Sequence, residues 1–397
     1  MTSAQWTTLR KRVLRDLRDQ SLAEVFGDSA RRGAVYRWGM SAAKGGRCSD
    51  ELHWLSRIAV GASTDAKRFQ GIEPSDMIRR LHESIGRREC ELDLAIEAVV
   101  WGAAMPGLLN HLEETEWWGL LGAIQDYREG LLHRDPTDPT ALAGIAEIGL
   151  TLAWCLRSLP SCRRLAESSR QALKKWCEHD DVAVTSALCQ PQEVRLALAS
   201  LLRTGMLLGA IESAKTPSKK KKKSEDKKSK SVGGKKIAAA IDRIGIDLTT
   251  WVAAMTRPGG VHALVDLTPK DSPEDAAVQG LLRSAAALDP ESLGPAMKAA
   301  LGESKSNGRL AWQVSLPESM LHDEDAKLAC LLPEWDVRRG RMVISYGRPG
   351  KRLELQRTRL EMMAGKAVLI SGDCETNVRV DGRSLQPIGD WVATCEY

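Results

Sequence analysis

The segment Glu91-Leu-Asp-Leu-Ala-Ile-Glu-Ala-Val-Val-Trp-Gly-Ala-Ala104 decides the fold class of this chain. Apolar side chains recur on several sides of a helix drawn through it, and a helix of that kind is buried between other helices. Met105-Pro106-Gly107 follows directly and predicts that the helix stops there. We therefore expect a core of packed helices in this part of the chain.

Helix signals continue on both sides of this segment. Ser49 and Asp138-Pro139 are start signals, because a Ser or Asp side chain accepts a free amide hydrogen and Pro suits the first helical position. Short turns between the expected helices are typical of antiparallel helix hairpins. The expected helices cover residues 1–25, 49–59, 74–85, 91–104, 116–132, 139–156, 160–177, 191–212 and 237–255, with shorter ones after Ser272-Pro273 and Asp289-Pro290.

A Lys-rich tract at 215–236 separates two of these helices. It holds eleven Lys and two acidic residues, so it carries a formal charge of +9 in a chain of net charge +5, and the remainder carries −4. Such a tract buries too little apolar surface to offset its ordering entropy, and we predict a disordered insertion. Lys219–Lys223 offers a non-specific contact to polyanions, although no interleaved aromatic side chain supplies base stacking.

The C-terminal part has a different pattern, with short apolar segments that predict strands at 342–346, 352–360, 367–371, 377–380 and 391–396. Asp381-Gly382 is typical of a hairpin turn. The last expected strand runs into Tyr397, so one hypothesis is that this is a piece of a longer protein and that partner strands are missing. The expected organisation is a helical domain at 1–268 that contains the insertion at 215–236, a helical linker at 269–308 and an antiparallel β domain at 309–397.

Several function classes are poorly supported by the sequence. The nine Cys are scattered without a Cys-x-x-Cys pair, which argues against zinc and favours small buried side chains in a reducing compartment. Walker A, dinucleotide-binding, nucleophile-elbow and zinc-protease motifs are absent from the sequence, and we expect no metal or cofactor. The N-terminal residues show no apolar signal region and no segment has the length of a membrane span, so we expect a cytoplasmic protein.

Three polar segments are candidates for chemistry. Asn110-His111 could hold a carboxylate and move a proton, or form an ordinary polar turn. His179-Asp180-Asp181 could bind a metal or tune the imidazole pKa, although a solvated capping cluster is the simpler interpretation. Gly259-Gly260-Val261-His262 permits a tight turn from which His262 could project into a cleft.

The order of a Trp-rich helical part and a β part resembles the heparinase II/III-like polysaccharide lyases. The similar segments are Ala103-Ala-Met-Pro-Gly-Leu-Leu, Glu116-Trp-Trp-Gly-Leu-Leu, Ile148-Gly-Leu-Thr-Leu-Ala-Trp-Cys-Leu, Arg257-Pro-Gly-Gly-Val-His-Ala-Leu, Ala311-Trp-Gln-Val and Gly389-Asp-Trp-Val-Ala-Thr-Cys. The resemblance implies an incomplete α/α toroid followed by an antiparallel β-sandwich. It also implies an acidic polysaccharide substrate, an Asn or His that neutralises the uronate carboxylate, and a Tyr or His that removes the C5 proton in a β-elimination.

On that resemblance, we expect catalytic roles for His179, His262 and Tyr127, and substrate contacts from Asn110, His111, Trp117 and Arg257. The chain departs from the family where a polar dyad is expected, because Asp180–Cys189 contains no Asn and no Tyr. The β part holds one His, His322. These departures favour a non-catalytic or truncated relative.

Two hypotheses follow. The first is a heparinase II/III-like protein that binds acidic polysaccharide, with β-elimination as the reaction that the resemblance implies. The second is a non-catalytic helical scaffold or interaction protein whose Lys-rich loop contacts a polyanion.

Overall fold

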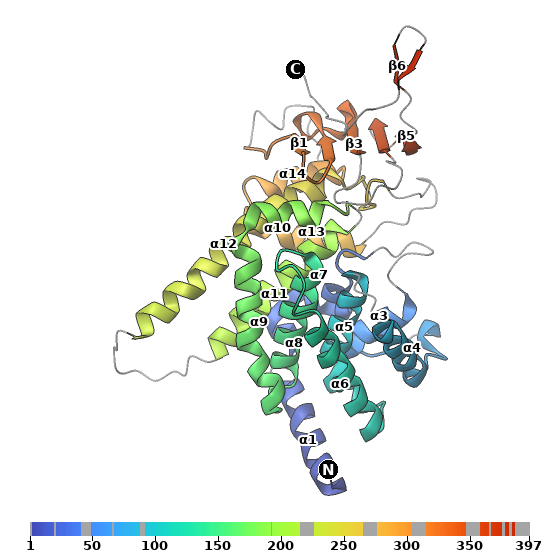
Figure 1. Ribbon diagram of the computed structural model, residues 1–397. Coiled ribbons are helices and arrows are strands. Elements are labelled where there is room, and N and C mark those ends of the chain that lie inside the picture. Colours follow the sequence, from blue (N-terminus) through green and yellow to red (C-terminus); the bar gives the residue numbers. More distant parts are fainter. Residues whose placement is uncertain are drawn as a thin grey trace. The chain divides into compact units, whose positions relative to one another are not determined.

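The computed structural model of this protein is mainly helical and carries a small antiparallel sheet in its C-terminal part (Figure 1). The structure describes residues 2–19, 21–40, 49–65, 67–87, 92–191, 193–214, 226–264, 276–303, 315–346, 358–364, 367–374, 378–380 and 383–385. The chain divides into two compact units: residues 1–183 with 196–244, and residues 184–195 with 245–397.

The first unit is a helical assembly built around α5. This helix runs from Leu92 to Leu108 and buries nearly all of its side chains, as the sequence predicted. It packs against α3, α6 and α8, and α8 packs in turn against α9 (Figure 1). The helices of this unit are α1 (Ser3–Asp19), α2 (Leu22–Phe26), α3 (Asp50–Ala59), α4 (Pro74–Gly86), α5, α6 (Glu114–Gly130), α7 (Pro139–Ala141), α8 (Ile148–Cys155) and α9 (Pro160–Glu178), with the 3₁₀ segments η1 (Gly27–Arg37) and η2 (Lys67–Phe69).

The predicted helix starts are confirmed where a side chain caps the first turn. Ser49 Oγ accepts from the Leu52 amide at 3.1 Å, and Asp138 Oδ1 accepts from the Thr140 amide at 2.7 Å. Each cap satisfies one of the amide groups that the first turn leaves without an intrahelical partner. These contacts span only two or three residues, so the local sequence is sufficient to predict them.

Some boundaries differ from the predictions. Helix α5 continues through Pro106 to Leu108, because a Pro in the last turn removes only one hydrogen bond close to the natural end. Residues Asp180–Leu188, expected between helices, form α10. Three helices, α10, α11 (Val194–Ala214) and α12 (Asp226–Ala254), each have residues in both units. Helix α12 begins eleven residues before the expected Ile237, within the Lys-rich tract, whereas residues 215–225 lie outside the described residues.

A π-helical segment, η3 (Leu142–Glu147), joins α7 to α8 and was not predicted. Its wider turn leaves carbonyl groups to be satisfied from outside the helix. Arg128 Nε and Ser169 Oγ both donate to the Ile145 carbonyl, at 3.0 and 3.2 Å. The segment ends at Glu147, whose fully buried carboxylate accepts two bonds from the guanidinium of Arg203 on α11.

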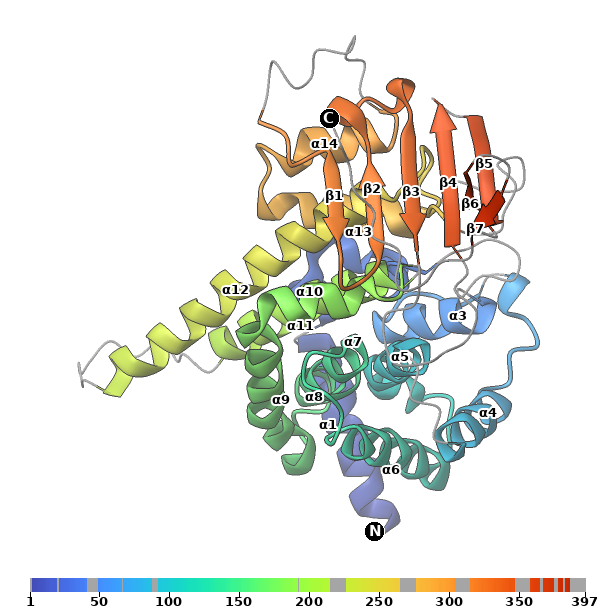
Figure 2. The same cartoon turned by 45° about the horizontal axis from the view of Figure 1, so that its top comes forward.

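The second unit contains a five-stranded antiparallel sheet in the order β1-β2-β3-β4-β5 (Figure 2). A separate two-stranded hairpin is formed by β6 and β7. The strands are β1 (Met320–Asp323), β2 (Leu328–Leu331), β3 (Arg341–Ser345), β4 (Thr358–Ala364), β5 (Ala367–Cys374), β6 (Val378–Val380) and β7 (Arg383–Leu385). Its short helices are α13 (Ala276–Ala285), η5 (Ala286–Leu288), α14 (Leu293–Ala300), η6 (Pro333–Trp335) and η7 (Val337–Arg339).

Four of the strand predictions match described strands at their positions, namely β3, β4, β5 and β6. Of the prediction at 352–360, residues 352–357 lie outside the described residues, and β4 continues past its expected end to Ala364. The prediction at 391–396 also lies outside the described residues. Strands β1, β2 and β7 were not among the predicted strands.

The division into units also differs from the predicted boundary at 268/269. The second unit takes in residues 245–264 and 184–195. Side chains of the sheet hold both segments: Glu361 on β4 binds Arg257, and Asp323 on β1 accepts from Thr185 at 2.7 Å. Such contacts between distant segments are not visible in local sequence patterns.

One described helix, Val194–Ala214, has the length and composition of a membrane span. Its most apolar window is 78% buried inside the structure, as the core helix of a globular unit would be. This is weak evidence for a membrane span.

The Arg203–Glu147 pair predicts a large stability effect. Changing Arg203 to Met leaves the Glu147 carboxylate buried without its cation, so unfolding in urea should require about 3 to 5 kcal/mol less free energy. Arg79→Met, which removes an exposed Arg79–Glu83 pair on α4, is the matched control and should leave the unfolding midpoint nearly unchanged. A loss no larger for Arg203→Met than for this control would contradict the assignment.

Candidate functional site

A row of polar side chains lies on one face of β3 and β4. Arg341 pairs with Met363, Val343 with Glu361 and Ser345 with Arg359 in the antiparallel register. Because alternate residues of a strand share a face, Arg341, Ser345, Arg359 and Glu361 all lie on the same side of the sheet. Arg341 and Glu361 are buried, whereas Arg359 and Ser345 are partly exposed.

Glu361 binds the loop that follows α12. Its carboxylate accepts from Arg257 Nε at 2.9 Å and from a terminal nitrogen of the same guanidinium at 2.5 Å. Glu361 Oε2 also accepts from the Leu264 amide at 2.9 Å. We call this three-membered arrangement of Glu361, Arg257 and the Leu264 amide the carboxylate clamp.

The clamped loop makes a tight turn. Thr256 and His262 form an antiparallel bridge, and Gly259 and Gly260 both adopt φ of +94°. Two consecutive residues in the left-handed region favour glycine, as predicted for this turn. Arg341 donates to the carbonyls of Thr256 and Ala254, and burial lowers its pKa to about 10, so the guanidinium stays charged at neutral pH.

Leu264 has φ of +62°, in the left-handed region that side chains other than glycine rarely adopt. Holding a residue in such a region costs about 1 to 3 kcal/mol and requires support from its surroundings. The bond from its amide to Glu361 supplies such support. Strained residues cluster at active sites, ligand clamps and switch regions.

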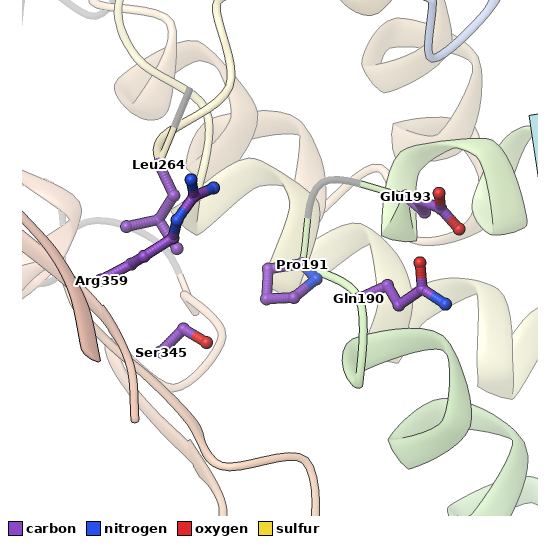
Figure 3. Close-up of a pocket in the computed structure, with 6 residues that line it drawn as sticks. All are labelled: Gln190, Pro191, Glu193, Leu264, Ser345 and Arg359. Atoms are coloured by element: carbon purple, nitrogen blue, oxygen red, sulfur yellow. The ribbon is translucent and has the colours of Figure 1, made fainter. Parts of the chain in front are cut away.

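A pocket of about 230 Å³ lies beside Leu264 and is lined by Gln190, Pro191, Glu193, Leu264, Ser345 and Arg359. Figure 3 shows Leu264, Arg359 and Ser345 along one side of this space and Pro191, Gln190 and Glu193 along the other. The lining therefore combines one guanidinium, one carboxylate, an amide, a hydroxyl and two apolar surfaces. The first side comes from the clamped loop and the sheet, the second from the connection between α10 and α11.

The second side is internally ordered. With its nitrogen directed at Glu193, the Gln190 amide donates to both carboxylate oxygens, at 3.0 and 3.3 Å. Pro191 between them has a fixed φ and adds a rigid apolar surface. The connection between α10 and α11 therefore supplies hydrogen-bonding groups to the pocket, and the contact between Gln190 and Glu193 fixes their positions.

His262, expected in a cleft, is instead completely buried. Its Nδ1 lies 2.5 Å from the Ala263 carbonyl, and in the part of the chain that the structure describes its Nε2 has no hydrogen-bond partner. Burial first, and then the nearby guanidinium groups of Arg195, Arg257 and Arg341, hold its pKa well below the usual value. The imidazole is therefore neutral at physiological pH and is closed to a polysaccharide in this conformation.

The predicted site residues are divided between the two units. Arg257 and His262 belong to the second unit, and Arg257 is buried in the carboxylate clamp. The first unit holds the other five, Asn110, His111, Trp117, Tyr127 and His179. Trp117 and Tyr127 are core residues of α6, and the Trp117 indole donates to the Met105 carbonyl at 2.9 Å. These two positions offer no open surface to a substrate.

The remaining three are exposed. Asn110 Oδ1 accepts from Arg10 at 3.1 Å, and the His111 ring meets Trp54 edge to face at 5.4 Å between centroids. Partial burial lowers the pKa of His111. His179 ends α9, and the adjacent Asp180 carboxylate pairs with Arg243 at 2.5 Å. Asp180 therefore serves an ion pair, and within the described ranges no group of three His, Cys, Asp or Glu residues is placed to hold a metal.

The sequence interpretation missed the pocket. Its residues come from four separate segments, namely residues 190–193, the loop that ends at Leu264, β3 and β4, and none of them was among the predicted site residues. The comparisons give no further guidance, because no family model, no curated protein and no solved structure matches this chain.

The buried neutral His262 predicts a pH dependence of stability. Its pKa is depressed in the folded protein, so protons bind preferentially to the unfolded chain below about pH 6.5, and stability falls as the pH falls. Between pH 7.5 and 5.5 this His should contribute a loss on the order of 1 kcal/mol in the free energy of unfolding.

The measurement is urea unfolding of the wild type and of His262→Asn, which keeps a donor to the Ala263 carbonyl but does not titrate in this range. The variant should lose less stability on acidification than the wild type. His111→Asn is the control for the other shifted His. Equal pH dependence in the wild type and His262→Asn would show that His262 is accessible to protons in the folded protein.

Proposed function

We propose that this chain binds an acidic saccharide through the pocket at Arg359 and does not cleave it. The observation that carries the proposal is the composition of the pocket, whose lining combines a guanidinium, a carboxylate, an amide, a hydroxyl and two apolar side chains. A uronate unit presents the complementary groups: one carboxylate, several hydroxyls and an apolar ring face. Arg is the side chain best suited to hold a carboxylate, through two parallel hydrogen bonds.

Each remaining group of the pocket has a role in this proposal. Ring hydroxyls can donate to Glu193 and exchange hydrogen bonds with Gln190 and Ser345. The C–H face of the ring packs on Leu264 and Pro191. The volume of about 230 Å³ is below the 300 to 1,000 Å³ of pockets for larger ligands, so it suits one sugar unit of a chain.

The proposal contains no catalytic step because of where the expected catalytic residues lie. His262 and Tyr127 are buried, and the third expected catalytic residue, His179, is exposed but belongs to the first unit and does not line the pocket. A base within hydrogen-bond reach of a substrate proton is the first requirement of β-elimination. The positions of these residues therefore favour a protein that binds an acidic saccharide without cleaving it.

The finer architecture is part of the same proposal: an incomplete α/α toroid for the helical unit and one layer of a β-sandwich for the sheet. Short connections between neighbouring helices, such as residues 156–159 between α8 and α9, support the first. The second is supported by the sheet face opposite Glu361. It carries half-exposed apolar side chains that a second layer would cover, namely Met320, Leu331, Met342, Ile344, Leu360 and Met362. Contact of Lys219–Lys223 with polyanions stays a prediction from the sequence.

Titration with D-glucuronate and D-galacturonate tests the binding proposal. A single sugar in a small pocket should bind with a dissociation constant on the order of 1 mM, and D-glucose should bind more weakly because it lacks the carboxylate. Arg359→Ala should weaken uronate binding about tenfold through loss of the charge-assisted hydrogen bonds.

Arg338→Ala is the matched control, since Arg338 pairs with Asp336 on the surface of the same unit and does not line the pocket. Equal affinity for uronate and glucose, or equal effects of the two Arg variants, would contradict the proposal. Incubation with uronate polysaccharides should give no rise in ultraviolet absorbance from an unsaturated product. Such a rise would show that the protein cleaves its ligand.

A further inference from the structure

We propose that Glu361 is a positioning residue for the pocket. Its carboxylate holds Leu264 in the left-handed conformation and thereby fixes the side of the pocket on which a ligand would pack. Glu361 itself does not line the pocket. The effect of Glu361 on ligand binding rests on the proposed function, whereas its effect on the conformation of Leu264 does not.

The first step of the argument is where the backbone pairing of the loop ends. The Arg257 amide donates to the Val261 carbonyl at 2.6 Å, and the Ala263 amide donates to the Met255 carbonyl at 2.7 Å. Leu264 is the next residue, and its amide donates to a side chain, Glu361 Oε2, at 2.9 Å. The conformation of Leu264 therefore depends on a group that the sheet supplies.

The second step is the conformation of Leu264. A Leu residue left to its intrinsic preference adopts negative φ, because its Cβ crowds the following carbonyl in the left-handed region. At φ of +62° its side chain lines the pocket beside Arg359 (Figure 3). Rotation of the backbone to negative φ would redirect the Cα–Cβ bond and so change the shape of this wall.

The third step is the charge of Glu361. The residue is 1% exposed, and the paired guanidinium of Arg257 keeps a carboxylate favourable at so buried a position. Both carboxylate oxygens accept from Arg257, and Oε2 serves Leu264 as well. Arg257 thus orients the carboxylate that binds the Leu264 amide, two residues along β4 from the Arg359 that lines the pocket.

The test combines hydrogen exchange with a double-mutant cycle. In the wild type the Leu264 amide should exchange slowly, and Glu361→Gln should accelerate its exchange at least tenfold. The same variant should weaken D-glucuronate binding about tenfold. In a Leu264→Asn background the further loss caused by Glu361→Gln should be less than about threefold, because Asn adopts positive φ more readily than Leu.

Glu147→Gln is the matched control, since it makes the same change in a buried Glu–Arg pair of the other unit. It should lower the unfolding temperature and leave both the Leu264 exchange rate and the D-glucuronate affinity unchanged. An affinity loss in Glu147→Gln equal to that in Glu361→Gln would reduce Glu361 to a general stabilising role and overturn the inference.

Two further outcomes separate this inference from the proposed function. Fast exchange of the Leu264 amide in the wild type, or equal losses from Glu361→Gln in both backgrounds, overturns the positioning role even if D-glucuronate binds. Absence of D-glucuronate binding to the wild type removes the proposed function. In that case hydrogen exchange at Leu264 tests only whether Glu361 fixes the conformation of Leu264. Faster exchange in Glu361→Gln supports this role, and unchanged exchange overturns it.

Discussion

The arrangement of the second unit depends on one buried carboxylate. Glu361 joins a strand of the sheet to the loop after α12 by accepting from a guanidinium and from a backbone amide. Neither segment could bury its polar groups alone, because an unpaired carboxylate or amide away from water is costly. Together they form a face on which a row of polar groups runs from buried Arg341 to partly exposed Arg359.

The helical unit also contains a buried Glu–Arg pair. Glu147 and Arg203 are both fully buried, and the Arg203 guanidinium also donates to the Val35 carbonyl at 3.2 Å. Three segments distant in the sequence therefore meet at one guanidinium. The two units share the use of a buried Glu–Arg pair as a joint, but the pair in the first unit has no strained residue attached to it. A ligand site is proposed in the second unit because the pocket beside the strained Leu264 combines groups that complement a uronate.

The parts of the structure that could be predicted from the sequence are those fixed by neighbouring residues. Ser49 and Asp138 cap helices within their own first turns, and the apolar pattern around α5 marks a buried helix directly. The glycine pair at 259 and 260 indicated a tight turn, and both residues have positive φ. These features need no knowledge of the tertiary fold.

The candidate site could not be predicted in the same way. Arg257 and Glu361 are 104 positions apart, and no local pattern indicates that they pair. His262 was correctly placed in a turn, but the sequence gives no sign that Arg341 and the sheet cover that turn. Leu264 is apolar and unremarkable in the sequence, and its importance comes from a backbone angle alone.

The π-helical segment between α7 and α8 has a consequence for how the chain tolerates changes in length. Deletion of one residue from Leu142–Glu147 would allow a regular α-helix with its full set of hydrogen bonds. A π turn holds one residue more than an α turn, so the helix on either side of the deletion would keep nearly the same rotational position. The buried faces of α7 and α8 would therefore stay directed at the core. The deletion would remove the extra turn that leaves the Ile145 carbonyl to Arg128 and Ser169. The segment can thus lose one residue without turning the helices beside it, whereas a deletion within the regular helix α5 would rotate one end against the other by about 100°.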